Sequence, residues 1–521
     1  MTLPESLSAL LEPDAYPHPC DDIQVVETHI SWVLLTGSVA YKLKKPVAFS
    51  FVDFSTLAQR EHFCREELRC NARFAPGLYL GVVAVTRDDR GRVAIDGGGE
   101  VLEWAVKMRQ FPAEAQLDRV VERGDATREM LETFGRSLAR QHADLPAQRV
   151  DATELEPRVL APARENFDDI RALTWTQPYA ETLDRVSSAS EAVAERHHAW
   201  LELRLRDGWT RECHGDLHLS NLVLLEDQVT AFDCLEFNPS LRWIDPQSDV
   251  AFLFMDCLVR EREDLGYAFV DGYLDGCGDY DGARLLPFYA GYRSMVRAKV
   301  AALGREVPDD GGLASPDDPH LARFVRHLSW ADAYFGRPPG QLVLMCGVSG
   351  SGKSYLARRL VPDLPAVRLR SDVARKAQAG MDPGESGRSA VGTGLYAPGR
   401  SDAVYAWLAD VAADLLRSGE HVLVDATFLE PERREPFVSL GREVGRPAVV
   451  VHCDAPADVL RERVKRRARA GADVSDADLA VLEHQLETFE APDGVIRFDT
   501  AAEVTPERLQ RLRRQVLGQP E

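Results

Sequence analysis

The chain has 521 residues, and because one domain typically has roughly 100–200 residues, this length predicts two or more domains. Hydrophobic residues make up 45% and charged residues 28% of the chain, a composition that excludes disordered, collagen-like and coiled-coil proteins. The 62 Lys and Arg against 83 Asp and Glu give a formal net charge of −21, which argues against a general binder of nucleic acid or of acidic membranes.

The cysteines and the N-terminus indicate the compartment. The nine cysteines are scattered and form no C-x-x-C pair, so we expect neither a zinc knuckle nor a disulfide framework. Residues 1–5 lack the basic and apolar regions of an export signal, and the longest apolar stretch, near 251–255, is far shorter than the ~20 residues of a membrane span. We therefore expect a cytoplasmic protein without a membrane segment.

In chain order, the first predicted elements are strands. Residues 22–112 predict one helix, 57–74, among five strands, which are 23–26, 31–35, 39–43, 80–85 and 101–108. Thr36-Gly37-Ser38 has the chemistry of a hairpin turn. Residues 113–334 then predict mostly helices, interrupted by a β-like passage at 222–232. This order predicts an α+β domain with a β-rich small lobe, about 20–112, and a helical lobe, 113–335.

The second predicted domain has an α/β pattern. Gly336-Arg337-Pro338-Pro339-Gly340 precedes an apolar strand, so we place the boundary there and expect domains 1–335 and 341–521. The predicted strands are 342–346, 366–369, 421–424 and 448–452. The predicted helices between and after them are 354–360, 373–379, 403–416, 432–444 and 457–470. Such alternation predicts a parallel sheet covered by helices on both faces.

The segment 213–221 carries the first chemical motif. It reads Cys-His-Gly-Asp-Leu-His-Leu-Ser-Asn, and Asp233 ends the β-like passage that follows it. This spacing suits phosphoryl transfer, with Asp216 accepting a hydroxyl proton and with Asn221 and Asp233 holding Mg²⁺. Two alternatives stay open at this point: a metal site built from Asp216 and the two histidines of the segment, which lacks a zinc spacing, and a purely structural loop.

On a β-then-α chain, this H-x-D-x-x-x-x-N run with a later aspartate resembles the aminoglycoside phosphotransferase branch of the protein-kinase-like fold, over roughly residues 20–334. The resemblance implies that Asp216 is the catalytic base and that Asn221 and Asp233 are Mg²⁺ ligands. It also implies that His214 supports the loop and that Asp249 braces it.

The same resemblance implies an ATP-binding lysine on the third strand and a carboxylate partner on the following helix. Lys42 and Lys44 lie on one face of that strand; Lys42 is favoured because Ala-x-Lys matches the kinase-like pattern, and Lys44 is the alternative. Glu67 is favoured over Glu66 as the partner. The chain departs from protein kinases in lacking G-x-G-x-x-G before Lys42 and in the dipeptide Cys-Leu that follows Asp233.

The second domain contains a nucleotide-binding motif between a predicted strand and a predicted helix. The pattern G-x-x-x-x-G-K-[ST] is satisfied by Gly347, Val348, Ser349, Gly350, Ser351, Gly352, Lys353 and Ser354. Its glycines let backbone N–H groups surround phosphate oxygens, Lys353 reaches the β- and γ-phosphates, and Ser354 can hold Mg²⁺. We therefore expect ATP and Mg²⁺ as cofactors.

An aspartate follows each of the next two predicted strands. Asp372 could accept a substrate hydroxyl proton, or it could be only the N-cap of the helix 373–379. Asp425 ends the strand 421–424 and could hold Mg²⁺ or contact the substrate, or it could simply cap the strand.

The densest basic run of the chain lies on the predicted helix 457–470. It comprises Arg461, Arg463, Lys465, Arg466, Arg467 and Arg469. Such runs commonly mark a solvated face, but here we favour a mobile lid whose arginines meet the transferred phosphoryl group. Arg463 and Arg467 are four residues apart and point together on a helix, so both are candidate catalytic residues.

Residues 341–500 resemble the small P-loop kinases that include gluconate kinases, chloramphenicol phosphotransferase and the kinase domain of polynucleotide 5′-kinases. The matching pieces are the phosphate loop, residues 371–375, residues 425–428 with Arg433-Arg434 after them, and the arginine-rich run. In that family the aspartate after the second strand is the general base, which the resemblance carries onto Asp372. The pairing of both domains resembles bacterial proteins described as bifunctional aminoglycoside phosphotransferase-like and ATP-binding kinases.

The sequence thus predicts a phosphotransferase with two ATP- and Mg²⁺-dependent domains that act on hydroxyl groups of small molecules. One alternative makes the first domain a pseudo-kinase sensor that gates the second, because the glycine-rich loop is absent. Another makes the second domain a polynucleotide 5′-hydroxyl kinase. Residues 341–521 carry 25 basic and 27 acidic residues, which permits this, but the −19 on residues 1–340 makes a nucleic-acid partner unfavourable. We expect the helical lobe and the segment 381–401 to set substrate choice.

Overall fold

The computed structural model describes residues 3–20, 22–49, 52–305, 318–381, 398–470, 479–489, 491–492 and 494–520. The chain forms two compact units, and each is assembled from separate stretches of sequence. Unit 1 comprises Met1–Ala126, Leu145–Gln148 and Trp209–Asp249. Unit 2 comprises Thr127–Asp144, Arg149–Gly208 and Val250–Glu521.

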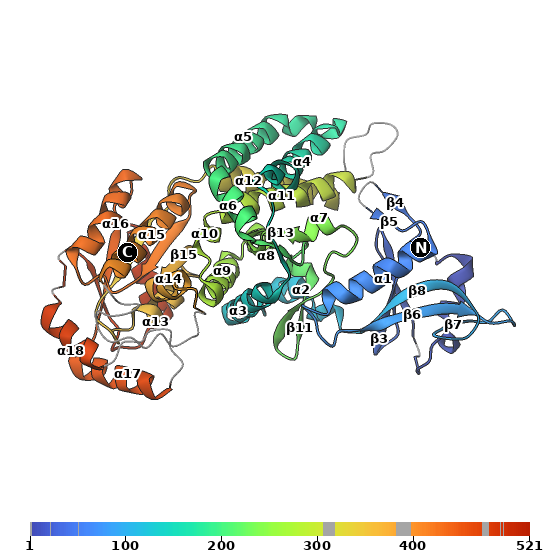
Figure 1. Cartoon of the computed structure of the whole chain (residues 1–521), viewed down its shortest axis with the longest axis horizontal. Coiled ribbons are helices and arrows are strands. Elements are labelled where there is room, and N and C mark those ends of the chain that lie inside the picture. Colours follow the sequence, from blue (N-terminus) through green and yellow to red (C-terminus); the bar gives the residue numbers. More distant parts are fainter. Residues whose placement is uncertain are drawn as a thin grey trace. The chain divides into compact units, whose positions relative to one another are not determined.

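Unit 1 is built on a six-stranded antiparallel sheet with the strand order β1-β2-β3-β8-β6-β7 (Figure 1). Its strands are β1 (Gln24–Glu27), β2 (Ser31–Leu35), β3 (Val39–Lys44), β6 (Tyr79–Arg87), β7 (Val93–Ile95) and β8 (Glu100–Arg109). A small hairpin of β4 (Ala48–Phe49) and β5 (Val52–Asp53) stands apart from this sheet. The five predicted strands and the turn between β2 and β3 are therefore confirmed, whereas β4, β5 and β7 were not predicted.

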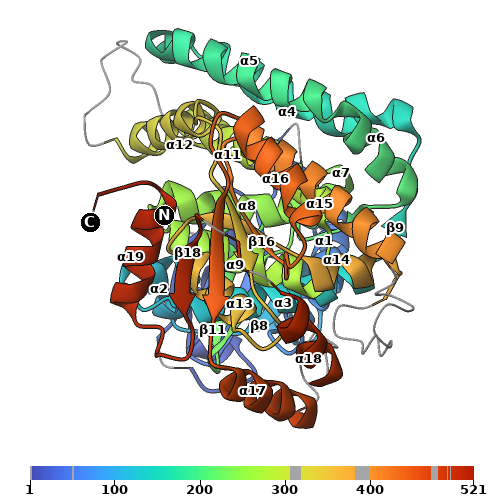
Figure 2. The ribbon, with the colours of Figure 1, turned by 90° about the vertical axis from the view of Figure 1, so that its left-hand side faces the viewer.

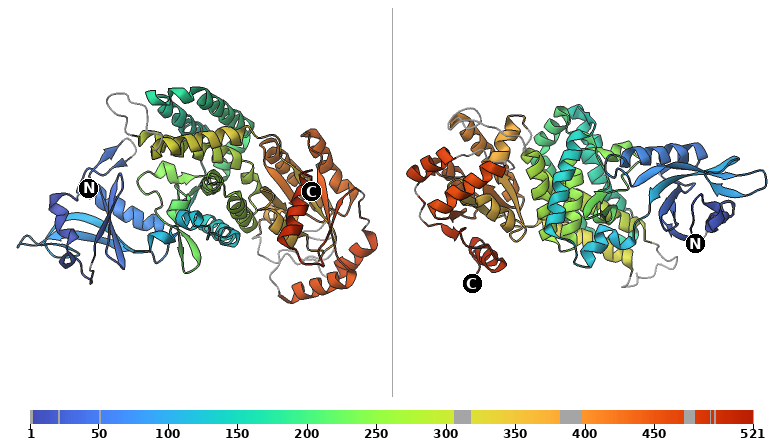
Figure 3. Two further views of the ribbon diagram at one scale, coloured as in Figure 1. Left: turned by 180° about the vertical axis from the view of Figure 1, so that it is seen from behind. Right: turned by 90° about the horizontal axis from the view of Figure 1, so that it is seen from below.

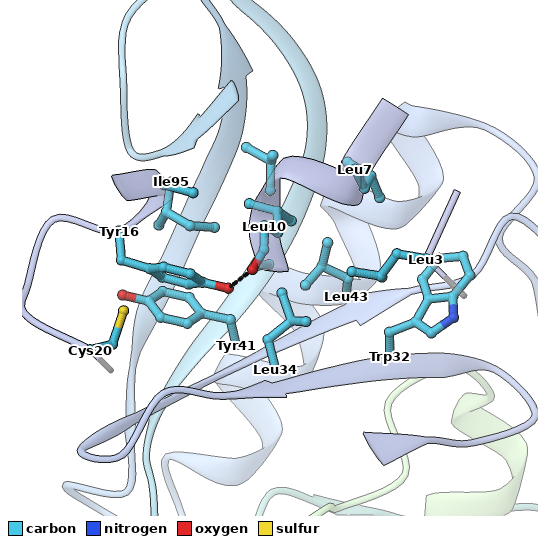
Figure 4. Close-up of a cluster of buried hydrophobic side chains, with 13 residues drawn as sticks. Leu3, Leu7, Leu10, Tyr16, Cys20, Trp32, Leu34, Tyr41, Leu43 and Ile95 are labelled. Atoms are coloured by element: carbon cyan, nitrogen blue, oxygen red, sulfur yellow. Dashed lines mark hydrogen bonds between the residues drawn. The ribbon is translucent and has the colours of Figure 1, made fainter. Parts of the chain in front are cut away.

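One face of the sheet packs against the N-terminal residues (Figure 4). Leucines of the 3-10 helix η1 (Glu5–Leu11) and Tyr16, which follows the short helix η2 (Pro13–Ala15), share a buried cluster with Tyr41 and Leu43. The Tyr16 hydroxyl donates to the carbonyl of Leu10 at 2.6 Å. Because side chains alternate along a strand, this packing turns the two lysines of β3 toward the opposite face.

Helix α1 (Leu57–Asn71) covers that opposite face (Figure 3). It begins with a capping box, in which the side chain of Thr56 accepts from the backbone N–H of Gln59 and the side chain of Gln59 accepts from that of Thr56. Cys64 of α1 shares a buried cluster with Ala40 of β3. Glu67, one turn after Cys64, is thereby carried to the face of the two lysines.

Short elements complete unit 1. Strand β10 (Thr210–Glu212) lies between β9 (Ala147–Gln148) and β13 (Trp243–Ile244), and β11 (Leu222–Leu225) pairs with β12 (Gln228–Ala231) in a hairpin. This hairpin confirms the predicted β-like passage. The helices of this part are η3 (Ala113–Ala115), α2 (Leu117–Glu122), η7 (Leu219–Asn221) and α7 (Pro239–Arg242).

Unit 2 begins with helices. They are α3 (Arg128–Asp144), η4 (Ala152–Glu154), η5 (Glu156–Leu160), α4 (Ala161–Arg171), η6 (Thr174–Tyr179), α5 (Ala180–Arg196), α6 (His198–Asp207), α8 (Pro246–Val259, whose first turn belongs to unit 1), α9 (Glu263–Cys277), α10 (Tyr280–Ala283), α11 (Leu286–Leu303) and α12 (Pro319–Phe335). The predicted helical character is confirmed. Helices α3 and α9 approach closely at Gly135 and Gly272, where a Cβ on Gly272 would lie 2.1 Å from the carbonyl oxygen of Glu132.

The remainder of unit 2 is a five-stranded parallel sheet with the order β15-β16-β14-β17-β18, which confirms the predicted parallel sheet (Figure 2). The strands are β14 (Leu342–Cys346), β15 (Ala366–Arg370), β16 (His421–Asp425), β17 (Val449–Asp454) and β18 (Ile496–Asp499). The helices are α13 (Lys353–Leu360), α14 (Ser371–Gln378), α15 (Pro398–Arg417), α16 (Pro431–Glu443), α17 (Ala457–Ala470), α18 (Leu479–Thr488) and α19 (Pro506–Val516). In the part of the chain that the structure describes, no helix combines the length and hydropathy needed to cross a membrane.

Candidate active sites

A buried charged centre in unit 1 joins β3, α1 and the segment after β12. Lys42 Nζ donates to Glu67 Oε1 at 2.9 Å and to Asp233 Oδ1 at 2.5 Å. Lys44 Nζ donates to Glu67 Oε2 at 2.8 Å and also to Glu236. Glu67 therefore binds both candidate lysines, and the two alternatives offered by the sequence do not exclude each other. Glu236 was not predicted, because nothing in its local sequence points to Lys44.

The ionisation of this centre follows from its charges. Burial would lower the pKa of Lys42, but Asp233 and Glu67 outweigh burial and hold it well above its ordinary value. Burial would likewise raise the pKa of Glu67, whereas Lys42 and Lys44 lower it to about 2. Lys42 thus remains a cation and Glu67 an anion at neutral pH. Glu66, the other candidate, instead pairs with Arg69, at 2.9 Å.

The segment 213–221 is held in place by two residues outside it, Phe232 and Asp249. His214 Nε2 lies 2.9 Å from the carbonyl oxygen of Phe232, and because that oxygen can only accept, Nε2 carries the proton. Burial lowers the pKa of His214, so the ring is neutral. Asp249 accepts from the backbone N–H groups of His214 and Gly215 at 2.7 and 2.9 Å, which is the brace that the family resemblance implies.

Gly215 has a structural reason to be glycine. Its φ is +86°, and a Cβ there would lie 2.9 Å from the carbonyl oxygen of Leu241. The backbone N–H of Asp216 lies 3.4 Å from His214 Nδ1. With one ring nitrogen protonated toward Phe232 and the other facing this N–H, His214 has a structural role and does not act as a metal ligand.

The loop ends at Asn221, which contacts the candidate base. Asn221 Nδ2 donates to both the backbone oxygen and Oδ2 of Asp216, each at 2.9 Å. His218 Nε2 also lies 3.4 Å from Asp216 Oδ2. The Asp216 side chain is 38% exposed, so its carboxylate is open to a substrate hydroxyl. Since the Asn221 amide nitrogen faces Asp216, its amide oxygen is the atom that could bind a cation.

Asp233 is held in an unusual backbone conformation. Its φ is +60°, a left-handed value that costs energy for a residue other than glycine and that clusters at functional sites. Its N–H donates to the Tyr79 hydroxyl at 3.0 Å, and the next N–H donates to Asn71 Oδ1 at 2.9 Å. The Asp233 side chain is 41% exposed. The Asp233 carboxylate and the amide oxygen of Asn221 are oxygen ligands of the kind that Mg²⁺ prefers.

In unit 2, the phosphate loop lies between β14 and α13, as predicted. Gly347, Gly350 and Gly352 have φ values of +140°, +79° and +83°, which other residues rarely adopt. Lys353 Nζ donates to the carbonyl of Val348 at 2.9 Å. Burial lowers the pKa of Lys353. The N–H of Ser349, a phosphate-binding group in such loops, donates to Gln485 of α18 at 2.7 Å.

A serine and an aspartate meet beside this loop. Strands β14 and β16 are paired, and Ser354 Oγ donates to Asp425 Oδ1 at 3.1 Å. Asp425 Oδ2 is buried and makes no hydrogen bond among the described residues; Arg368 Nη1 and Arg370 Nε each lie 3.6 Å away. A hydroxyl and an uncommitted carboxylate oxygen fit a magnesium ion. Arg368 and Arg370 were not predicted as site residues.

Asp372 lies in the first turn of α14. The N-cap position of this helix is Arg370, so the N-cap interpretation of Asp372 is wrong: the helix begins two residues earlier than predicted. Asp372 Oδ1 accepts from Arg375 Nη1 at 2.8 Å, and the Asp372 side chain is 28% exposed. Residues 382–397, most of the segment expected to select the substrate, lie outside the described residues.

Arg463, in the basic run on α17, contacts the phosphate loop. Arg463 Nη1 lies 3.4 Å from the carbonyl of Gly350, and Nη2 donates to the carbonyl of Thr500 at 2.6 Å. Arg461 instead pairs with Glu483 at 2.7 Å, and Arg467 lies one turn beyond Arg463. Leu460 and Val464 share a buried cluster with Val348 and Leu482. This helix is therefore packed on the loop and is more than a solvated face.

Comparison with known proteins matches two families along the chain. Residues 91–286 match the phosphotransferase enzyme family, and residues 342–492 match a family described as an AAA domain. The uncharacterized protein Rv2004c of Mycobacterium tuberculosis is 32% identical over 474 residues, which cover 89% of this chain and 91% of that protein.

Two solved structures resemble parts of the chain. An APS kinase of Mycobacterium tuberculosis is 22% identical and aligns with 35% of this chain and 99% of its own, with a TM-score of 0.27. A Plasmodium vivax ethanolamine kinase is 11% identical and aligns with 60% of this chain and 82% of its own, with a TM-score of 0.36.

Proposed function

Because the chain belongs to the family of the mycobacterial protein Rv2004c and joins a phosphotransferase-family domain to a P-loop AAA domain, we propose that it is an ATP- and Mg²⁺-dependent kinase with two active sites. Each site transfers the γ-phosphoryl group of ATP to a hydroxyl group of a small molecule.

The observation that supports this proposal is that each unit contains its own candidate groups for binding nucleotide and metal and for accepting a proton. In unit 1 these are Lys42 with its partner Glu67, the candidate metal ligands Asn221 and Asp233, and the partly exposed carboxylate of Asp216. In unit 2 they are the phosphate loop with Lys353, the contact between Ser354 and Asp425, and the carboxylate of Asp372. A module that only binds nucleotide needs no candidate base.

In unit 1, Glu67 fixes the position and charge of Lys42, which binds the ATP phosphates. Asn221 and Asp233 would hold Mg²⁺, and the ion would supply positive charge to the phosphates of the nucleotide. Asp216 accepts the proton of the attacking hydroxyl, and Asn221 orients its carboxylate through the 2.9 Å hydrogen bond.

In unit 2, the backbone N–H groups of the phosphate loop and Lys353 bind the β- and γ-phosphates. Ser354 and Asp425 would hold Mg²⁺. Asp372 accepts the substrate proton. Arg463 and Arg467 of α17 stabilise the transferred phosphoryl group.

The test is transfer of label from γ-labelled ATP to a panel of sugars, aminocyclitols and nucleosides. Asp216→Asn and Lys353→Ala are each expected to abolish one component of transfer, by ~10²–10⁴-fold for the base. The exposed Asp227→Asn and Lys465→Ala are matched controls that should retain both components. If Asp216→Asn and Lys353→Ala left transfer to every acceptor intact, the proposal would be wrong.

One observation favours a sensor role for unit 1 instead. The β1–β2 turn, where protein kinases carry a glycine-rich loop, is only three residues long (28–30) and contains no glycine, and the backbone N–H of Ser31 donates to Thr28 Oγ1 across it at 3.0 Å. Calorimetry with ATP in the Lys353→Ala background decides between the roles. Binding that requires Mg²⁺ and Asp233 supports an enzyme, whereas no nucleotide binding supports a sensor.

A further inference from the structure

Two buried arginines on β15 bind helix α9, which lies inside the region matched to the phosphotransferase family. Arg368 pairs with Asp271 through two hydrogen bonds, Nε to Oδ1 at 2.7 Å and Nη2 to Oδ2 at 3.0 Å. Arg370 Nη1 donates to Asp275, one helical turn after Asp271. The side chains of both arginines are at most 10% exposed. These pairs thus bring residues of the two matched families into one buried network.

The end of α9 fits tightly against the same strand and the helix after it. The hydroxyl of Tyr280, just beyond α9, accepts from the backbone N–H of Arg370 at 2.9 Å. A Cβ on Gly278 would lie 2.9 Å from Ala377 of α14, the helix that carries Asp372. The end of α9 therefore contacts β15 and α14 through a backbone hydrogen bond and close packing as well as through ion pairs.

The same two arginines lie beside the candidate metal ligand. The strand register pairs Arg370 with Asp425, and both guanidinium groups lie 3.6 Å from Asp425 Oδ2 without a hydrogen bond to it. Asp425 Oδ1 is already bound to Ser354. Asp425 Oδ2, the oxygen that remains available to Mg²⁺, therefore has the guanidinium groups of Arg368 and Arg370 next to it.

A neighbouring cation competes with Mg²⁺ for a carboxylate oxygen unless its own charge and donors are satisfied elsewhere. The aspartates of α9 supply that compensation. We propose that Asp275, supported by Asp271, is a positioning residue of the P-loop site: it keeps the guanidinium of Arg370 off Asp425 so that Asp425 can bind Mg²⁺. The inference rests on the proposed function of that site. It makes the P-loop domain dependent on a helix of the other matched family.

The test measures ATP binding by calorimetry as a function of Mg²⁺ concentration, in full-length protein carrying Lys42→Ala so that the P-loop site is observed. Asp275→Asn should raise the Mg²⁺ concentration for half-maximal binding about 10-fold, as loss of an outer-shell partner commonly does. Binding of ATP without Mg²⁺ should stay within about 2-fold. Adding Arg370→Gln to Asp275→Asn should restore the wild-type Mg²⁺ dependence, because the competing cation is then gone.

The matched control is Asp414→Asn, which breaks the pair of Asp414 on α15 with the buried Arg284; among the described residues, Asp414 makes no hydrogen bond or ion pair with the phosphate loop. It should leave the Mg²⁺ dependence unchanged. The inference is overturned if Asp275→Asn has the Mg²⁺ dependence of the parent, or if its defect persists in the double variant. If Asp275→Asn does not fold, Arg370→Gln alone decides, since weaker Mg²⁺ binding in that variant would overturn the inference. Absence of ATP binding in the Lys42→Ala parent would instead refute the proposed function.

Discussion

Glu67 is a buried anion shared by two lysines, and its neighbour Glu66 offers a matched comparison. Glu67→Gln leaves Lys42 and Lys44 with one carboxylate fewer inside the protein, so we expect it to lower the free energy of unfolding of unit 1 by about 3–5 kcal/mol. Glu66 is partly exposed and binds Arg69, so Glu66→Gln should cost about 1 kcal/mol or less. Urea unfolding of both variants checks this. An equal cost at the two positions would contradict the assigned centre.

Whether Asp372 accepts a substrate proton distinguishes a kinase from a simple ATPase at the P-loop site. If Asp372 accepts the substrate proton, Asp372→Asn should keep ATP affinity within a few-fold and cut transfer by ~10²–10⁴-fold. Arg375→Gln removes the partner of Asp372 and is the comparison. A merely structural ion pair predicts similar, small losses in both variants, whereas a base predicts a much larger loss in Asp372→Asn. Single-turnover transfer and ATP calorimetry distinguish the two.

His327 predicts a pH dependence of the stability of unit 2. The ring is buried in α12, and burial lowers its pKa to about 3, against about 6.5 in the unfolded chain. Between these values the unfolded state binds a proton that the folded state does not. The stability contributed by the neutral ring is thus complete above pH 6.5 and is lost at about 1.4 kcal/mol per unit as the pH falls toward 3.

His327→Asn removes this contribution, so the measurement is the difference in unfolding free energy between wild type and variant. That difference should be constant above pH 7 and should change by about 1.4 kcal/mol per unit between pH 6 and pH 4.5. A difference that is independent of pH across this range would show that the ring is not held neutral.

At the scale of elements, the crossing of α3 and α9 depends on glycine. A Cβ on Gly272 would meet the carbonyl oxygen of Glu132 at 2.1 Å, so Gly272→Ala must push the helices apart. We expect a loss of about 3 kcal/mol in stability, measured by urea unfolding. Gly399, on α15, has nothing within 4 Å of its added Cβ, and Gly399→Ala should be neutral or slightly stabilising. A neutral Gly272→Ala would contradict the close packing.

Elements with a local signal were predictable, and those without one were not. Strand β14 was predicted to the residue because it is a continuous apolar run bounded by a glycine loop. Strand β18 (Ile496–Asp499) was missed because only two of its four residues are apolar, and an edge strand needs little burial. The start of α14 was placed too late because its first residue, Ser371, was read as part of the loop.

The candidate sites divide in the same way. The phosphate loop and the segment 213–221 are contiguous in sequence, so their residues could be identified from spacing. The pair of Arg368 and Asp271 joins residues 97 positions apart, and neither carries a motif. Lys44 and Glu236 are 192 positions apart. Such pairs arise only when the sheet and helices pack, and a single sequence holds no trace of that packing.

At the scale of the whole molecule, the predicted boundary at 336–340 can be tested with the fragment 341–521. In the full chain, buried Glu420 accepts from Tyr334 at 2.6 Å, from Tyr267 and from Arg337, and Arg368 binds Asp271. The fragment lacks all of these partners. We expect it to melt roughly 10 °C or more below the corresponding transition of the full chain.

Differential scanning calorimetry of the fragment and of the full chain makes this comparison. Addition of separately prepared residues 1–340 should raise the melting temperature of the fragment, because it restores the missing partners. A fragment as stable as the full chain would show that residues 341–521 fold independently of α9 and α12.

Because unit 1 is assembled from separate stretches of sequence, its parts are synthesised at different times. Its six-stranded sheet is encoded before residue 110, but the segment 213–221 and Glu236 follow residue 208. At roughly 5–20 residues per second, the intervening stretch takes about 5–20 s to leave the ribosome. Through that interval the nascent sheet carries Lys44 with one of its two carboxylates still missing. The charged centre can therefore be completed only after Glu236 has been synthesised. Until then, we expect Lys44 to remain in contact with solvent.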